Sequence, residues 1–299
     1  MSYGRIRQYP GGLNVLYGGT RKMPKEFSRP WQQSIPVQTD PERCAFCKRD
    51  QVIVLGKFEN GWIHLQNKFT PYSFHEMVIP PSCWPEEELR ILGGVAGIWR
   101  ALVNLERIVS EAVPMHNELW VTAHVGALAG QNITHLHYHV HEPERFPRDA
   151  DPALVAEAMC QINDREEALL AHLRQSPLAI GCSLHPVYCV VVESIFRVGQ
   201  CFIIPDSVAR LHPVVFGALL AEVTRCYAET FRSTQGLAPD FQIFMKFYRG
   251  DFIYASYLPI LNNHGATDSV GAIISGGSLT HPWTPEETLA ALRKTRGLG

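Results

Sequence analysis

Four histidines alternate with apolar residues in one short segment, residues 135–141, whose sequence is HLHYHVH. A period of two is the period of a β-strand, because successive side chains of a strand point to opposite faces of the sheet. The segment therefore predicts a strand with its imidazoles on one face and its apolar residues packed on the other. Just before it, Gly126 and Gly130 enclose a loop that ends in Gln131 and Asn132. Such a loop can bring backbone N–H groups close to an anion.

Two kinds of chemistry use histidines at this spacing. Same-face neighbours on a strand lie about 6.6 Å apart and the end pair about 20 Å apart, from a rise of ~3.3 Å per residue. Two of the four could therefore chelate one ion, but all four could not. Alternatively, a central imidazole attacks a phosphorus while its neighbours hold phosphate oxygens or protonate a leaving group. A strand of solvated histidines is a third interpretation, and the density of histidine argues against it.

At this point the segment resembles a known family. Gly126, Ala129-Gly130-Gln131 and residues 135–140 look like the histidine-triad superfamily of nucleotidyl transferases and hydrolases. Residues 67–80, NKFTPYSFHEMVIP, resemble the strand that precedes the triad in that superfamily. Residues 29–32 and 270–293 resemble segments of galactose-1-phosphate uridylyltransferases. The resemblance runs from about residue 29 to about residue 293 and favours the branch with two repeats.

The order of the expected elements also indicates a repeat. We expect strands over 51–58, 62–66, 76–79 and 118–123 and one helix over 85–113, followed after a charged linker by a helix over 152–175. Strands over 185–192, 200–205, 241–247 and 251–261 and a helix over 214–231 then repeat the order. Ile203-Ile204-Pro205 echoes Val78-Ile79-Pro80.

The expected fold class is therefore α+β, with two histidine-triad-like repeats forming a mainly antiparallel sheet and helices packed on it. The expected division is an irregular N-terminal arm (1–40), a repeat with a zinc site and the histidine triad (41–147), and a degenerate C-terminal repeat (148–299). In the degenerate repeat, residues 252–259 stand where the triad strand should be, and they contain no histidine.

The first cysteines form the pair Cys44-Ala-Phe-Cys47. Two thiolates at this spacing can bind one zinc ion from a tight turn, and a redox pair is the other interpretation, although no thioredoxin pattern surrounds them. In the resemblance, Cys83 stands where many members have a histidine ligand, and His135 is the fourth ligand in the uridylyltransferases. The resemblance thus implies one structural Zn²⁺ held by Cys44, Cys47, Cys83 and His135. Three buried cysteines without a metal are the alternative.

The resemblance also assigns roles. His137 would be the nucleophile: its inner nitrogen would donate to the main-chain carbonyl of His135, leaving the outer nitrogen free to attack an α-phosphorus. The nucleotidyl group would then pass to a second phosphate or to water. His139 would be the second catalytic residue. The candidates for substrate or phosphate binding are Gln131, Asn132, His124, His75 and Arg29. Local turn or strand hydrogen bonding is the alternative for each of these polar helpers.

One departure bears directly on the reaction. Uridylyltransferases have glutamine where this chain has His139, and histidine at that place is the hydrolase pattern. A histidine can protonate a leaving group, whereas an amide can only form hydrogen bonds. We therefore expect a nucleotidyltransferase of the galactose-1-phosphate uridylyltransferase type that acts on a nucleoside-diphosphate compound with a diverged acceptor. A hydrolase or phosphorylase of nucleotide conjugates or dinucleoside polyphosphates is the alternative. There are two further alternatives. One is a non-catalytic, zinc-stabilised nucleotide-binding module, and the other is a metal-dependent hydrolase that uses histidines as open-site ligands.

The composition of the chain limits the classes of binding partner that we expect. The net charge of −2 gives no bulk attraction to nucleic acid. The sequence has no apolar run of roughly 18 residues and no signal-peptide core, so we expect a cytoplasmic protein without a membrane partner. Its eight cysteines are then more consistent with reduced core residues or metal ligands than with disulfides. The expected partner is a nucleotide or nucleotide-sugar substrate, and the resemblance implies a homodimer.

Overall fold

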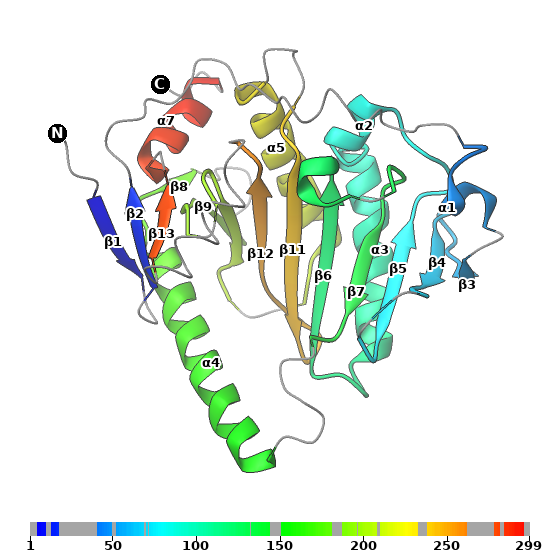
Figure 1. The fold of residues 1–299 in the computed structure, drawn as a ribbon, viewed down its shortest axis with the longest axis horizontal. Coiled ribbons are helices and arrows are strands. Elements are labelled where there is room, and N and C mark those ends of the chain that lie inside the picture. The colour runs from blue at the N-terminus through cyan, green and yellow to red at the C-terminus, as the bar shows by residue number, and fades with distance from the viewer. Residues whose placement is uncertain are drawn as a thin grey trace.

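The computed structural model describes residues 5–9, 13–17, 41–49, 52–68, 70, 72–131, 133–143, 151–180, 187–195, 197–207, 210–232, 238–261, 278–281 and 284–295. Within them, one large sheet with helices packed on it dominates the molecule (Figure 1). All the strand pairings of this sheet are antiparallel. The predicted α+β fold is therefore confirmed.

The first half of the sheet has the order β3-β4-β5-β7-β6. Its strands are β3 (Ile53–Lys57), β4 (Ile63–Gln66), β5 (His75–Ile79), β6 (Glu118–Val125) and β7 (Tyr138–His141). Strands β3 and β4 form an antiparallel hairpin that turns at Gly61, whose φ of 88° suits glycine. Before β3 lies a short helix, α1 (Ala45–Lys48), which has Cys44 at its N-cap and Cys47 within it.

The second half has the order β8-β9-β10-β12-β11, the same order read from the other edge. Its strands are β8 (Ala179–Ile180), β9 (Tyr188–Val192), β10 (Cys201–Pro205), β11 (Phe241–Tyr248) and β12 (Asp251–Pro259). The two halves meet where β6 pairs with β11, in an unbroken register from Val125 opposite Phe241 to Glu118 opposite Tyr248. The repeated order is what two related units would give, and the domain boundaries at residues 40 and 147 stay a prediction.

Helices cover the two faces of the sheet differently. On one face, α3 (Gly94–Ala112), α5 (Pro213–Thr230) and α7 (Pro285–Thr295) share a large apolar core with the strands. On the other face, α4 (Pro152–Arg174) packs only on the second half, through a small cluster around Leu170 and Leu173. The first half of that second face bears the histidines. None of the helices in the described ranges is long and apolar enough to span a bilayer.

The single helix expected over residues 85–113 is wrong. The structure has two, α2 (Glu86–Arg90) and α3, separated by a turn in which Leu92 and Gly93 have φ of 56° and 70°. A Cβ on Gly93 would lie 2.6 Å from the Trp84 ring, so the turn needs glycine there. The apolar spacing continued through the break, which is why periodicity alone suggested one helix.

Part of the segment expected to be an irregular arm is ordered in strands. β1 (Arg5–Tyr9) and β2 (Leu13–Tyr17) form a hairpin, and β13 (Ser278–His281) pairs in parallel with β2. The third strand of this small sheet comes from the other end of the chain, so no local pattern near residue 10 could indicate it.

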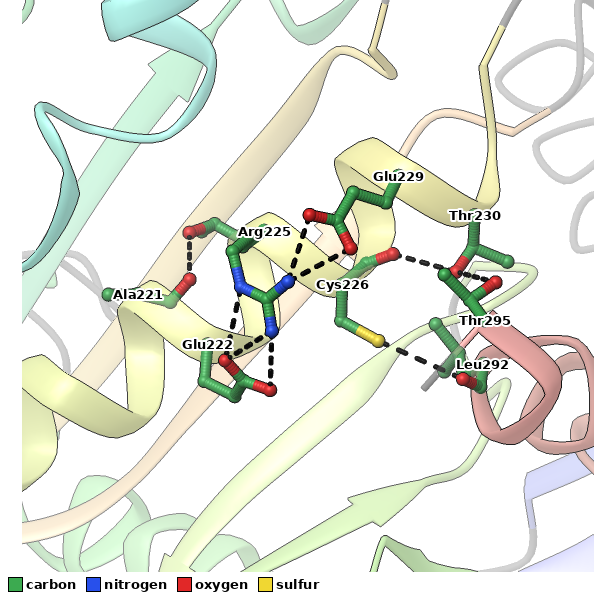
Figure 2. Close-up of polar contacts among 9 residues, drawn as sticks. Ala221, Glu222, Arg225, Cys226, Glu229, Thr230, Leu292 and Thr295 are labelled. Atoms are coloured by element: carbon green, nitrogen blue, oxygen red, sulfur yellow. Dashed lines mark hydrogen bonds and ion pairs between the residues drawn. The ribbon is translucent and has the colours of Figure 1, made fainter. Parts of the chain in front are cut away.

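Helices α5 and α7 are joined by polar contacts at their ends (Figure 2). The Thr230 hydroxyl donates to the Thr295 hydroxyl at 2.9 Å, and the Cys226 thiol lies 4.0 Å from the carbonyl of Leu292. On the outer side of α5, Arg225 bridges Glu222 and Glu229. An exposed pairing of this kind adds at most about 0.5 kcal/mol per pair.

Candidate active site

The histidine segment forms a strand later than expected. β7 begins at Tyr138, and His135 and His137 lie in the chain leading into it. The rings of His137 and His139 are nevertheless neighbours, with centroids 4.8 Å apart. His141 stacks on Tyr72 at 4.4 Å. The alternating pattern therefore brings His137, His139 and His141 together, and the Phe46 ring contacts His137 at 5.4 Å on the other side.

His137 is held by one of its two nitrogens. Its Nδ1 lies 2.7 Å from the carbonyl oxygen of His135, an acceptor, so Nδ1 carries the proton and donates. In the neutral ring, Nε2 then has the lone pair, and no described residue forms a hydrogen bond with it. Burial lowers the pKa of His137 to about 4 despite the stabilising bond to His135. The arrangement has the geometry of a nucleophile oriented by the main chain.

His75 joins His139 to a row of hydrogen bonds that continues to Thr70. His139 Nδ1 lies 2.8 Å from His75 Nε2, and His75 Nδ1 lies 2.6 Å from the hydroxyl of Thr70. The Asn67 amide nitrogen lies 3.3 Å from Nδ1 and 3.2 Å from Nε2 of His75, so it does not distinguish them. The Thr70 oxygen already accepts from the Tyr72 N–H at 3.0 Å, so we assign its own proton to the bond with His75 Nδ1, which then accepts. His75 Nε2–H then donates to His139 Nδ1, and the remaining proton of His139 is on Nε2. We infer that His139 presents an N–H donor to the site.

Both of these rings are neutral near pH 7. Burial and, after it, the neighbouring His137 and His75 together lower the pKa of His139 to about 2. Burial and the nearby His141 and His137 lower the pKa of His75 to about 4. Predicted as a substrate-binding residue, His75 lies where it orients His139 by a direct hydrogen bond.

His124 lies on β6, in the strand next to His139, with ring centroids 6.4 Å apart. Its Nδ1 donates to the carbonyl of Ala129 at 2.7 Å, an oxygen that also accepts from the Gln242 amide at 2.8 Å. Gln242 on β11 therefore holds the same carbonyl that fixes His124. The second half of the chain thus contributes directly to the site of the first.

The loop from Gly126 to Gln131 uses most of its amides internally. Gly126 N–H donates to the Gln131 side-chain oxygen at 2.7 Å, and the Gln131 amide donates to Thr134 O at 3.1 Å. The N–H groups of residues 129, 130 and 131 donate to loop carbonyls. The expectation that this loop presents those N–H groups to an anion is not met, because they close the turn itself. Gln131 here serves the closure of the loop.

A buried ion pair supports the same loop. Asp240 Oδ2 accepts from Leu128 N–H at 2.8 Å, and its other oxygen pairs with Arg90. Asp240 is fully buried and Arg90 is 6% exposed. A Cβ on Gly126 would lie 2.2 Å from the Asp240 carboxylate, so the close approach requires glycine. Sequence reasoning missed both charged residues, and no spacing or motif connects positions so far apart.

The predicted metal ligands lie together. The Sγ atoms of Cys44, Cys47 and Cys83 lie 3.5, 3.4 and 3.4 Å from Nδ1 of His135, and Cys47 Sγ lies 3.5 Å from Cys83 Sγ. All four ligand atoms lie within 4.8 Å of one another. His137 is not part of this cluster.

The donor set fits a tetrahedral ion. With Zn–S of about 2.3 Å and Zn–N of about 2.1 Å, neighbouring donors of a tetrahedron lie about 3.6 Å apart, close to the distances found here. His135 Nε2 donates to the carbonyl of Pro80 at 2.9 Å, which leaves Nδ1 as the lone-pair nitrogen facing the sulfurs. The cluster could thus hold one metal ion, with all four tetrahedral positions filled by protein donors.

Two of the predicted residues, Asn132 and Arg29, lie outside the described residues. His137 itself is 7% exposed. A cavity of about 560 Å³ lies on the same face of the sheet and is lined by Thr122, His124, Gln242 and residues of α4, β10, β11 and β12, but by neither His137 nor His139. Thr122 pairs directly with His139 across β6 and β7.

The α+β fold of this chain is that of solved uridylyltransferase-like structures, which is the fold that the sequence resemblance predicted. An ADP-glucose phosphorylase from Arabidopsis thaliana with bound ADP-glucose superposes with a TM-score of 0.66 at 16% identity, covering 97% of this chain and 99% of that chain. A GALT-like protein from the same plant gives 0.67 at 16%, covering 97% and 98%. A uridylyltransferase mutant gives 0.58 at 14%, covering 90% and 98%. No protein-family model and no curated protein matches the chain.

Proposed function

We propose that the protein is a nucleotidyltransferase that works through a covalent nucleotidyl-His137 intermediate on a nucleoside-diphosphate compound. The observation that carries this proposal is the 2.7 Å bond from His137 Nδ1 to the His135 carbonyl, which leaves Nε2 as the attacking atom. A structure with the same fold has ADP-glucose bound, which supports a nucleoside-diphosphate sugar as the class of substrate.

The reaction divides into two displacements. His137 Nε2 attacks the α-phosphorus, an N–P bond forms, and the bond from that phosphorus to the bridging oxygen breaks, so the distal phosphate leaves with the electron pair. An oxygen of the acceptor phosphate then attacks the same phosphorus, and the N–P bond breaks to regenerate the neutral ring. Apart from the nucleophile, the protein groups in such a transfer position the substrate and stabilise charge on the phosphoryl oxygens.

His139 favours transfer over hydrolysis in this proposal. A ring whose pKa is about 2 is not an imidazolium near pH 7, so it has no surplus proton to give to a leaving group. Its Nε2–H, set by the bond from His75, is instead a neutral donor to a phosphoryl oxygen. That is the capacity of the glutamine amide that uridylyltransferases have at this position. A hydrolase or phosphorylase remains the second candidate, because histidine is the hydrolase residue there.

In the same proposal the cluster of Cys44, Cys47, Cys83 and His135 holds a structural Zn²⁺. Four protein donors leave no position for a reacting water, so the ion would fix the chain that leads into His137 and take no part in the transfer.

The test is covalent labelling with ADP-glucose or UDP-glucose carrying ³²P in the α-phosphate. We expect acid-labile, alkali-stable label on the wild type and none on His137→Asn. His212→Asn is the matched control, because His212 caps the start of α5 and asparagine is a good N-cap. Absence of label on the wild type, or label that persists in His137→Asn, would contradict the proposal.

Acceptor dependence separates the two candidates. Labelled protein should discharge rapidly onto a sugar 1-phosphate and slowly in buffer alone; rapid discharge in water would establish a hydrolase, and discharge onto inorganic phosphate a phosphorylase. His139→Gln should keep transfer within about 10-fold because the amide still donates, whereas His139→Ala should lose about 100-fold. If His139→Gln is as inactive as His139→Ala, a neutral donor is not what this position supplies.

A further inference from the structure

The cavity beside the histidines lies on the half of the sheet that has none. Its volume is about 560 Å³, within the range of small-molecule sites. Residues of α4 line it on one side, and residues of β10, β11 and β12 line it on the other. At one end it is lined by Thr122 and His124 of β6, and Thr122 pairs with His139 across β6 and β7. The cavity is therefore continuous with the histidine face but extends away from it.

Strand register shows which positions the cavity residues occupy. When Ile203-Ile204-Pro205 is aligned with Val78-Ile79-Pro80, Gln200 takes the position of His75 and Phe202 that of Met77. Met77 pairs with His139 in the first half, and Phe202 pairs with Ser256 in the second. Ser256 thus stands at the place of His139, and Tyr254, two residues earlier, at the place of His137.

The side-chain contacts repeat as well. His75 Nε2 lies 2.8 Å from His139 Nδ1, and the Gln200 amide donates to the Ser256 hydroxyl, also at 2.8 Å. Two pairs at equivalent places of the two halves thus make equivalent contacts. The cavity is the counterpart of the triad site in the other half of the sheet, with the imidazoles replaced.

Tyr254 and Ser256, which stand at the places of His137 and His139, cannot act as the histidines do, but they still line a surface on which a ligand can bind. The phenol of Tyr254 is protonated near pH 7 and is a poor nucleophile. The walls are largely apolar and aromatic, from Leu169, Phe202, Phe244, Tyr254 and Leu258. Among the polar lining groups, the Ser256 hydroxyl accepts from Gln200 and keeps its own proton to donate.

The cavity has no surplus positive charge. Arg165 and Glu166 of α4 both line it, and Glu166 pairs with Lys246, which also lies 3.5 Å from Glu118. The buried Lys246 is therefore already paired with two carboxylates, and Arg165, the basic residue that lines the cavity, is exposed to solvent. A flat, uncharged ring with polar edges fits such a lining better than an anion does.

We propose that this cavity is a non-catalytic binding site for a nucleoside, held by its planar, uncharged base at the place of the missing second triad. The choice of a nucleoside among flat heteroaromatic ligands rests on the proposed function, whereas the site itself rests on the cavity and the register. With this cavity the protein would have a second ligand-binding site beside the one at which His137 reacts.

The test is equilibrium binding of adenosine and uridine, measured by titration calorimetry without turnover. Leu169→Trp places an indole in the cavity from the half-buried side of α4, and Leu154→Trp is the control on the same helix, where the side chain is 65% exposed. We expect Leu169→Trp to weaken binding of one of the nucleosides at least 10-fold and Leu154→Trp to leave it unchanged. Leu258→Trp, which fills the cavity from β12, should act as Leu169→Trp does, and thermal melts check that each variant folds.

Two results would overturn the site: no binding of either nucleoside to the wild type, or binding that both cavity-filling variants leave intact. The second would place the nucleoside at the histidines instead. Labelling of His137 is read separately with the ³²P substrates, so a failure of this proposal and a failure of the proposed function give different results.

Discussion

At the scale of single residues, the site depends on which nitrogen of each ring carries a proton. His137 and His139 lie side by side, yet their neighbours orient them differently: a main-chain carbonyl holds Nδ1 of the first, and the His75 ring holds Nδ1 of the second. One ring therefore presents a lone pair and the other an N–H. Two residues of one type thus acquire complementary roles from their hydrogen-bond partners alone.

The neutral rings predict an acid-labile fold. The pKa of His139 is about 2 and that of His75 about 4 in the folded protein, against about 6.5 unfolded. Below pH 6.5 the unfolded chain binds more protons, so stability falls as pH falls, by up to about 1.4 kcal/mol per pH unit for His139. His75 contributes less, because it is only partly buried and solvent screens it.

Urea unfolding between pH 7 and pH 4.5 measures this dependence. His75→Gln/His139→Gln should lose less stability over that range than the wild type, and the exposed-site control His212→Gln should behave as the wild type does. Equal pH slopes in all three proteins would show that these histidines are not neutral in the folded state.

At the scale of elements, the loop between β6 and β7 is supported from three places in the chain. Its own Gln131 closes it, and Asp240, paired with Arg90 of α2, accepts from Leu128. The loop carries Ala129, whose carbonyl fixes His124. Rigid support of this kind is what keeps reacting groups in a productive geometry.

Gly126→Ala tests the closeness of this packing. The residue has φ of 91°, and the new Cβ would lie 2.2 Å from the Asp240 carboxylate, so we expect a loss of about 2–4 kcal/mol in unfolding free energy. Gly56→Ala is the control, because no atom lies within 4 Å of a Cβ there and φ is not positive. A Gly126→Ala protein as stable as Gly56→Ala would mean that the loop does not pack against Asp240.

The cluster of Cys44, Cys47, Cys83 and His135 joins three segments that lie far apart in the chain. Cys44 and Cys47 belong to α1 and its start, Cys83 follows β5, and His135 precedes β7. We expect one Zn²⁺ per chain by metal analysis, and its loss in Cys44→Ser with a destabilisation of roughly 3 kcal/mol, or about 5–10 °C in Tm. Cys160→Ser, an exposed site on α4, should keep both the ion and the Tm. Full metal content in Cys44→Ser would contradict the assignment of ligands.

At the scale of the whole molecule, a single sheet joins a half that has the histidines to a half that has lost them. The junction of β6 with β11 runs the full length of both strands, so the two halves share one apolar core on the face of α3 and α5. Gln242 crosses this junction to bind the Ala129 carbonyl. A homodimer stays a prediction from the resemblance, and sedimentation of the purified protein would measure it.

Much of this organisation could be predicted from the sequence because it is encoded locally. The alternating histidines predicted the strand β7, although it begins only at Tyr138, and the resemblance predicted that Cys44, Cys47, Cys83 and His135 lie together. Apolar residues at a period of two predicted most of the strands, and apolar residues at a period of three to four predicted most of the helices, with boundaries correct to within a few residues. The errors came where a local pattern continued through a break, as at Leu92 and Gly93.

The sequence by itself determined the fold class and indicated the candidate nucleophile His137 and the four residues of the Cys44, Cys47, Cys83 and His135 cluster, since each depends on residue types at fixed spacing or on a resemblance that those types carry. Only the tertiary structure decided the support of the Gly126 loop by Asp240 and Arg90, the role of His75, the contact of Gln242 with Ala129, and the cavity under α4. The physical reason is that these features arise between side chains far apart in the chain. A hydrogen bond or a cavity depends on atomic positions after packing, and no periodicity of the sequence specifies them.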